Sequence, residues 1–226
     1  MTDLLTMVSA AGPLAGGWGV HGLWMRRRLS AARRDLLSGL WTRAPFERRA
    51  ARVLARRPHT AVVLVDLDGF KALNDTFGHA AGDEAIRATA ASLNDALAEK
   101  RGAVAARLGG DEFAAVVPLE EPFTLPWLLN ALHGAITSPF TYGGRDLTVG
   151  ASIGAALSSD LTEKARPAGA AMLPVLLRLA DEAMYVAKRA GGGWNYPGAS
   201  EPRCTTTAGR RTGRPGTHAP HHREAA

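Results

Sequence analysis

Cysteine is almost absent from this chain of 226 residues, because Cys204 is the only one and it lies in a tail rich in proline, threonine, glycine and arginine. One thiol cannot build an intramolecular disulfide framework or a cysteine-based zinc cluster, and it argues against a cysteine-dependent enzyme. No internal repeat is present in the sequence. Hydrophobic residues make up 46% of the chain and charged residues 21%, which excludes a wholly disordered protein. The length suits one domain with extensions.

A basic core is also lacking, although the formal net charge is +6. Residues 1–34 carry five arginines and one acid, and residues 197–226 carry five arginines and two acids. The middle, residues 35–196, therefore holds 17 basic and 18 acidic side chains. Because the positive charge belongs to the ends, a nucleic-acid-binding fold is disfavoured.

Charged residues are missing between Leu4 and Met25, and Arg26–Arg28 follow directly. This order is typical of a single membrane span with its C-terminal side in the cytoplasm. Five glycines, Pro13 and His21 weaken the pattern, so a flexible or interfacial segment stays open as the alternative. A signal peptide is disfavoured because the charges come after the apolar stretch.

The hydrophobic pattern predicts an α+β sandwich, with a largely antiparallel sheet and helices packed on its faces. A helix is expected over about 30–57, a buried strand over 61–65, and helices over 83–98, 123–136 and 172–190. Two hairpins are expected, one joining 104–107 to 113–117 and one joining 140–142 to 147–157. From residue 197 the composition predicts a disordered basic tail.

Acidic residues gather at two strand ends. Asp66 and Asp68 close the buried strand, and alternation places them on one face. Asp111 and Glu112 stand at the tip of the first hairpin, within reach of Asp66 if the two elements pair. Carboxylates from adjacent strands suit a hard cation such as Mg²⁺. The plainer alternative is that these acids cap turns.

The glycine pair Gly109 and Gly110, directly before the two acids, favours the functional interpretation. Glycine lets a backbone approach a ligand closely and present N–H groups to phosphate oxygens. Metal ligands beside a phosphate-sized space are what phosphoryl transfer requires.

Five segments in the same order resemble the GGDEF family, the diguanylate cyclases. RLGGDEF at 107–113 is the signature that names the family. The family's opening motif resembles DLLSGLWTR at 35–43. Its metal- and guanine-binding segment resembles DLDGFKALND at 66–75, together with Gly82 and Asp83. SIGA at 152–155 and ADEAMYVAK at 180–188 resemble its late strand and last helix. The resemblance covers residues 35–196 and implies the palm-like nucleotidyl-cyclase sandwich.

The resemblance also implies a role for each matching residue. Asp66, the backbone carbonyl of Leu67, and Asp111 would hold Mg²⁺, with Mn²⁺ as the alternative metal. Glu112 would be the base or metal partner for the ribose 3′-hydroxyl. The residues implied to bind substrate are Asn74 and Asp83 at the guanine edge, Gly69, Phe70, Lys71, Gly109 and Gly110 through backbone N–H groups, and Lys188 through its charge.

Two departures from the family pattern stand out. Gly192 stands where the family has an arginine that meets the terminal phosphate, and Arg189 is the nearest replacement. The product-inhibition motif Arg-x-x-Asp is replaced by Lys100, Arg101, Gly102 and Ala103.

The function implied is condensation of two GTP into cyclic di-GMP, by a homodimer whose catalytic domain faces the cytoplasm. Residues 4–25 would anchor it to the membrane, and nucleic acid is not an expected partner. The alternative is an inactive GGDEF domain that binds GTP or a cyclic dinucleotide as a signalling module. Gly192 favours that alternative, whereas intact Asp66, Asp111 and Glu112 favour the enzyme.

Overall fold

The structure is a computed structural model, and it describes residues 33–161 and 171–198. The apolar segment Leu4–Met25 lies outside these ranges, as do residues 199–226 of the disordered tail predicted from residue 197. In the two described ranges, no helix combines the length and the apolar character needed to cross a bilayer.

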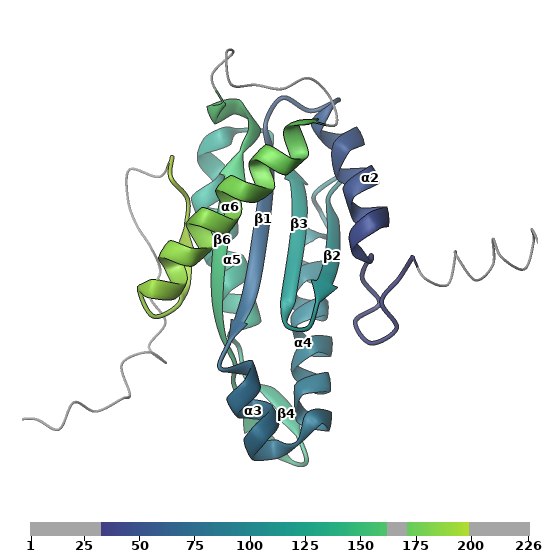
Figure 1. Cartoon of the computed structure of the whole chain (residues 1–226), viewed down its shortest axis with the longest axis vertical. Helices are drawn as coiled ribbons and strands as arrows, with labels where there is room; N and C mark the ends of the chain where they lie inside the picture. The colour runs from purple at the N-terminus through teal and green to yellow at the C-terminus, as the bar shows by residue number, and fades with distance from the viewer. Residues whose placement is uncertain (1–32, 162–170, 199–226) are drawn as a thin grey trace, which may run out of the picture.

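A five-stranded sheet forms the centre of the domain (Figure 1). Its strand order is β2-β3-β1-β6-β7, and every neighbouring pair is antiparallel except β6 and β7. The strands are β1 (Thr60–Asp68), β2 (Val104–Gly109), β3 (Glu112–Pro118), β6 (Gly150–Leu157) and β7 (Gly193–Asn195). A separate small hairpin joins β4 (Phe140–Tyr142) to β5 (Arg145–Leu147).

Helices cover both faces of this sheet. On one face, α2 (Arg43–Leu54) and α6 (Met172–Arg189) pack through Phe46, Leu176 and their neighbours. On the other face lie α4 (His79–Leu97) and α5 (Leu125–Ile136). Because both sides are covered, β1 reads as a continuous apolar run, and its first six residues are all buried. The predicted α+β sandwich with a mostly antiparallel sheet is confirmed.

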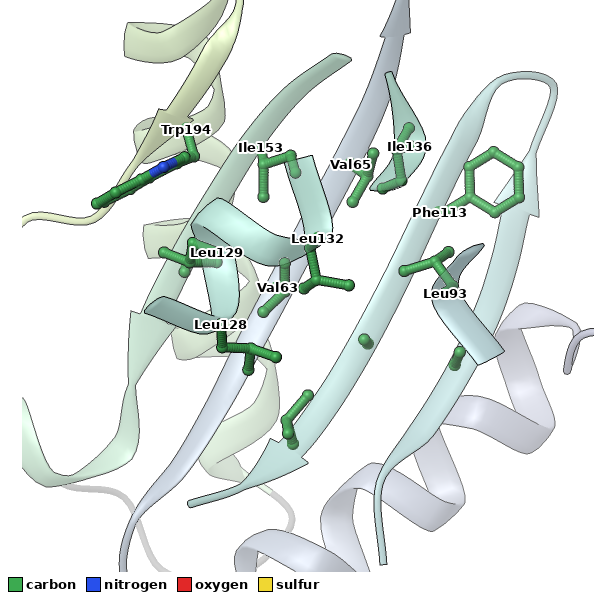
Figure 2. Close-up of a cluster of buried hydrophobic side chains, with 14 of the residues drawn as sticks. Val63, Val65, Leu93, Phe113, Leu128, Leu129, Leu132, Ile136, Ile153 and Trp194 are labelled. Atoms are coloured by element: carbon green, nitrogen blue, oxygen red, sulfur yellow. The ribbon is translucent and has the colours of Figure 1, made fainter. Parts of the chain in front are cut away.

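The larger core lies between the sheet and the α4–α5 layer. Figure 2 shows leucines of α5 and Leu93 of α4 over Val63, Val65 and Phe113 of the two central strands. Phe113 and Leu93 have no exposed surface. The residue after Glu112 therefore anchors the hairpin tip in the core, and this anchor fixes where the acidic tip stands.

Three short elements complete the described chain. Helix α3 (Phe70–Phe77) follows β1 directly, and the 3₁₀ turns η1 (Pro122–Thr124) and η2 (Ser158–Asp160) precede α5 and follow β6. Helix α3 packs on α4 and completes a third small core around Leu73, Ala81 and Leu147.

Two sequence predictions were wrong. The helix expected over 30–57 begins only at Arg43, because Asp35 accepts hydrogen bonds from the backbone N–H and hydroxyl of Ser38 and holds a turn there. The second hairpin is closed by β5, and β6 instead pairs with β1 in the main sheet. Both strands of this small hairpin, β4 and β5, are only three residues long.

Candidate active site

The two acidic segments meet at one end of the sheet. Asp66 of β1 is the register partner of Glu112 of β3, and the N–H of Leu67 donates to the carbonyl of Asp111 over 3.3 Å. The hairpin therefore pairs beside the strand, which is the condition that the sequence analysis set for bringing Asp111 and Glu112 within reach of Asp66. Asp66 and Glu112 share the sheet face that carries α6, since residues alternate along each strand.

Lys188 of α6 reaches this acidic group. Its ammonium lies 2.5 Å from Oδ1 of Asp66, whose side chain is 13% exposed. The hydrogen bond to Asp66 raises the pKa of Lys188 above its ordinary value, and the charges of Asp68 and Asp111 add to the effect. One cationic group thus stands in the field of three carboxylates.

The donors at this point fit a hard divalent cation. Within residues 33–161 and 171–198, no three acidic, histidine or cysteine side chains form a ready-made metal cluster. The donor set implied by the sequence is smaller: two carboxylates, from Asp66 and Asp111, and the carbonyl of Leu67. Such a set suits Mg²⁺, which keeps several waters and takes further oxygens from substrate phosphates. The ion pair of the Lys188 ammonium with Asp66, at 2.5 Å, supports this fit because it shows a cation held at this point.

Asp68 is held away from that role by β6. The buried hydroxyl of Ser152 donates to the Asp68 carboxylate, at 2.8 Å from Oδ1 and 3.0 Å from Oδ2. Burial raises the pKa of Asp68 and the Ser152 hydrogen bond opposes it, with a net shift above the ordinary value. The sequence analysis gave Ser152 no role, although SIGA was recognised as a family segment.

A second contact, which the sequence analysis did not predict, holds the Gly109–Gly110 pair in place. The guanidinium of Arg107 donates to the Gly110 carbonyl over 2.8 Å and to Asp35 over 3.0 Å. Burial acts to raise the pKa of Asp35, but hydrogen bonds from Ser38 and Arg107 hold it below the ordinary value. Because the Arg107 side chain is only 14% exposed, this ion pair clamps the hairpin tip to the turn at residue 35.

The residues implied to recognise guanine lie on α3 and α4. Gly69 adopts a left-handed φ of +75° and turns the chain from β1 into α3, with Phe70 half-buried and Lys71 exposed. The side-chain oxygen of Asn74 lies 2.1 Å from the place a Cβ would occupy on Gly82. Asn74 of α3 therefore rests against the backbone of Gly82, the residue directly before Asp83 in α4.

The position of the family's phosphate-binding arginine is occupied by Gly192, just after the end of α6. Gly192 is buried and its N–H donates to the Ala187 carbonyl. The Arg189 guanidinium lies 5.9 Å from the centre of the Tyr185 ring. Lys188 is thus the cation that α6 brings closest to the carboxylates.

A cavity of about 370 Å³ opens beside Glu112 on the α6 face of the sheet. Its lining combines an apolar floor with two arginines and two acids: Arg43, Leu64, Val65, Leu108, Glu112, Phe113, Leu177, Arg178, Asp181 and Met184. No sequence pattern indicated this cavity, because α2, α6 and the β2–β3 hairpin, which line it, are far apart along the chain.

Comparison with known proteins agrees with this geometry. The family model described as "Diguanylate cyclase, GGDEF domain" matches residues 32–193. An uncharacterised 19.3 kDa protein of Streptomyces ambofaciens is 45% identical over 76% of this chain and 87% of its own length. The diguanylate cyclase DgcP of Pseudomonas aeruginosa is 34% identical over 70% of this chain, which spans only 22% of DgcP.

A solved structure of a sensory box/GGDEF family protein from Caulobacter crescentus is 36% identical. It aligns with a TM-score of 0.59 over 71% of this chain and all of that one. The family match covers most of the described domain, and the acidic hairpin tip lies beside the acidic strand end as the motifs require. The chain therefore belongs to the GGDEF family, the diguanylate cyclases.

Proposed function

We propose that this protein condenses two GTP molecules into cyclic di-GMP, as a homodimer that requires Mg²⁺. In each half-reaction the 3′-oxygen of one GTP attacks the α-phosphorus of the other, the bond to the β,γ-pyrophosphate breaks, and pyrophosphate leaves with that electron pair. Two such steps close the ring and release two pyrophosphates. The observation that carries the proposal is the meeting of Asp66, Asp111, Glu112 and Lys188 at one sheet end.

The role that we propose for each residue follows from its position in the site. Asp66, Asp111 and the Leu67 carbonyl would hold the metal, which when bound neutralises phosphate charge and favours in-line attack. Glu112, exposed at the hairpin tip, would take the proton of the 3′-hydroxyl. Lys188 neutralises the carboxylates before substrate binds and can turn to the phosphates afterwards, because its side chain is 53% exposed.

Substrate would lie along the β1–α3 turn. Backbone N–H groups of Gly69, Phe70 and Lys71 would meet the β- and γ-phosphates, and those of Gly109 and Gly110 would lie beside the transferred group. Asn74 and Asp83 together offer an amide and a carboxylate, which match the acceptor and the two donors of the guanine edge.

A homodimer follows from the stoichiometry, since each domain would bind one GTP and the ring needs two. The cavity beside Glu112 has a volume in the range of small-molecule sites. Turnover per protein molecule is therefore expected to rise with protein concentration until the dimer is fully formed.

The second candidate is a GGDEF domain that binds GTP or a cyclic dinucleotide without turning it over. Gly192 favours it, because a family arginine is missing at that position and Arg189 lies near Tyr185 instead. A lone lysine lacks the planar two-bond contact that an arginine makes with phosphate.

Incubation of the full chain with GTP and Mg²⁺, with products identified by mass, separates the two candidates. Formation of cyclic di-GMP supports the enzyme, whereas binding of GTP without product supports the binding module. Asp111→Asn is expected to lower the rate at least about a hundredfold, since loss of a metal ligand removes several kcal/mol of transition-state stabilisation. Glu112→Gln should also be severely impaired.

The matched control is Asp95→Asn, because Asp95 is exposed on α4 and takes no part in the site. It removes the same charge and should leave the rate unchanged. Asp111→Asn turning over GTP like the native protein would overturn the metal-site assignment.

The location of the protein is proposed from sequence alone, because residues 4–25 lie outside the described ranges. An anchor in this segment, followed by Arg26–Arg28, would leave the catalytic domain in the cytoplasm with its GTP. The full-length protein should then resist extraction from membranes by high salt and by alkali. Release by salt alone would indicate surface attachment or no anchor.

A further inference from the structure

The outward side of α2 carries a cluster of arginines. We define the basic face as Arg33, Arg34, Arg48, Arg49, Arg52 and Arg56, all exposed except the half-buried Arg49. None of them forms an ion pair with a described residue, and Glu47 is the one acid in α2. Figure 1 shows α2 at the β2 edge of the molecule, away from α3 and the guanine-edge residues.

Two arginines of this face are fixed by stacking. The guanidinium carbons of Arg34 and Arg49 lie 3.6 and 3.5 Å from the centre of the Trp41 ring. Two guanidinium groups cannot occupy the same side of a ring at those distances, so they lie on opposite sides of the indole. Trp41 itself is only partly buried and packs against the core beneath α2 and α6. The stack keeps like charges together that would otherwise repel.

The charge of the described domain is sharply divided. Residues 33–59 contain eight arginines and two acids, for a net of +6. Residues 60–161 and 171–198 contain nine basic and fifteen acidic side chains, for a net of −6. A domain polarised in this way turns its basic face toward an anionic surface and its acidic remainder away from it.

Chain connectivity indicates which anionic surface lies near. Arg33 belongs to the basic face, and only eight residue steps separate it from Met25, where the uncharged stretch ends. At about 3.6 Å per residue, the stretch must end within roughly 30 Å of this face. If the stretch meets lipid, the face cannot lie far from the headgroups.

We propose that the basic face docks against the headgroups of an anionic membrane. Each basic residue close to such a surface strengthens association roughly fivefold. The glycines and Pro13 make the apolar stretch a weak anchor by itself, and stable attachment usually takes two signals. The basic face supplies the second signal and sets the orientation of the domain on the membrane.

Vesicle flotation of the full-length protein tests the proposal. Association should be stronger with vesicles containing phosphatidylglycerol than with phosphatidylcholine alone, and high salt should remove the difference. Arg48→Glu with Arg52→Glu should weaken binding to the anionic vesicles by at least roughly 30-fold. Arg101→Glu with Arg145→Glu changes the net charge equally at exposed positions outside the face, and should bind like the native protein.

The flotation difference applies while the apolar stretch is not inserted in the bilayer. Because an inserted stretch would carry every variant to the vesicles, a second readout reports the face itself. A dye on Ala55→Cys, at the end of α2, should be quenched by headgroup-labelled lipid in anionic vesicles, with Cys204→Ser as background. The same dye on Ala131→Cys of α5, on the other side of the sheet, should not be quenched.

Loss of the Ala55 signal in the Arg48→Glu, Arg52→Glu protein would support the proposal, provided that its melting temperature is that of the native protein. Unchanged quenching in that variant would overturn it. Binding of the face to double-stranded DNA in preference to anionic vesicles would overturn it as well. These readouts do not depend on cyclase activity, so they stand apart from the test of the proposed function.

Discussion

Asn74 and Asp83 are the residues on which nucleotide choice is expected to depend. Asn74 of α3 packs against Gly82 of α4, which has no side chain to hold it off, and Asp83 follows Gly82 directly. Asp83→Ala should weaken GTP binding by about 1–3 kcal/mol, since the guanine N–H donors would lose their acceptor. Asp75→Ala, an exposed acid of α3, is the control and should bind GTP normally. Competition by ATP as strong as that by GTP in the native protein would contradict the guanine-edge assignment.

At the residue scale, the motifs indicated which side chains belong to the site, but not the hydrogen bonds and ion pairs that position them. Alternation and the hairpin signal would bring Asp66 and Glu112 together only if the hairpin paired with β1, and the structure shows that pairing. The hydrogen bond from Ser152 to Asp68 joins residues 84 positions apart, and the ion pair of Arg107 with Asp35 joins residues 72 positions apart. Contacts at such separations leave no periodic mark in the sequence, so only the folded chain reveals them.

At the scale of elements, the placement of α6 depends on one close approach. A Cβ on Gly154 of β6 would lie 2.0 Å from the Ala180 carbonyl oxygen and 2.2 Å from the Met184 nitrogen. Gly154→Ala must therefore push α6 away from the sheet. We expect a loss of about 2 kcal/mol or more in unfolding free energy, and lower cyclase activity because α6 also carries Lys188.

Gly134→Ala provides the matched control for this prediction, because Gly134 lies in α5 with open space around it. The same substitution there should be neutral or stabilising by about 0.5–1 kcal/mol, since alanine favours a helix interior. Denaturant unfolding of both variants is the measurement. Equal stability of the two proteins would show that α6 can shift without cost.

Elements with strong local signals were predicted well, and those that depend on tertiary pairing were not. The β2–β3 hairpin and the three long helices follow from turn glycines and helical periodicity. The arginine- and alanine-rich stretch before Arg43 has a composition typical of a helix. It forms a turn instead, because Asp35 accepts hydrogen bonds from Ser38 and pairs with Arg107. The partner of β6 could not be predicted, because a fully buried strand shows no alternation to fix its place.

At the scale of the whole molecule, His133 makes stability depend on pH. It is 4% exposed on α5, its Nε2 has no hydrogen-bond partner in the described residues, and burial lowers its pKa below 6.5. The unfolded chain therefore binds a proton that the folded chain does not. Unfolding free energy should fall as pH drops below about 6.5, by at most about 1.4 kcal/mol per pH unit.

Comparison of pH 7 with pH 5.5 in urea measures this dependence. His133→Leu should flatten it, because the buried group that must take up the proton on unfolding is gone. His79→Gln, at the exposed start of α4, should retain the native slope. A slope that survives unchanged in His133→Leu would assign the pH dependence to other groups.

Regulation of the whole enzyme by its product should be weak in this chain. The family's inhibition motif needs an arginine and, three residues later, an aspartate, and here Lys100 and Ala103 stand at those positions in the turn between α4 and β2. Ala103 has no acceptor for guanine N–H donors, and Lys100 lacks the planar two-bond contact of arginine. Arg101 is exposed but stands one position out of register.

Initial rates with added cyclic di-GMP test this prediction. The native protein should keep its rate at product concentrations in the micromolar range, and the Lys100→Arg, Ala103→Asp double variant should become inhibited because it regains both the cation and the acceptor. Gain of inhibition in Ala103→Asp alone would mean that lysine suffices as the cation. Strong inhibition of the native protein that persists when Lys100 and Arg101 are both changed to alanine would contradict the prediction, since it would require a product site built from residues other than this turn.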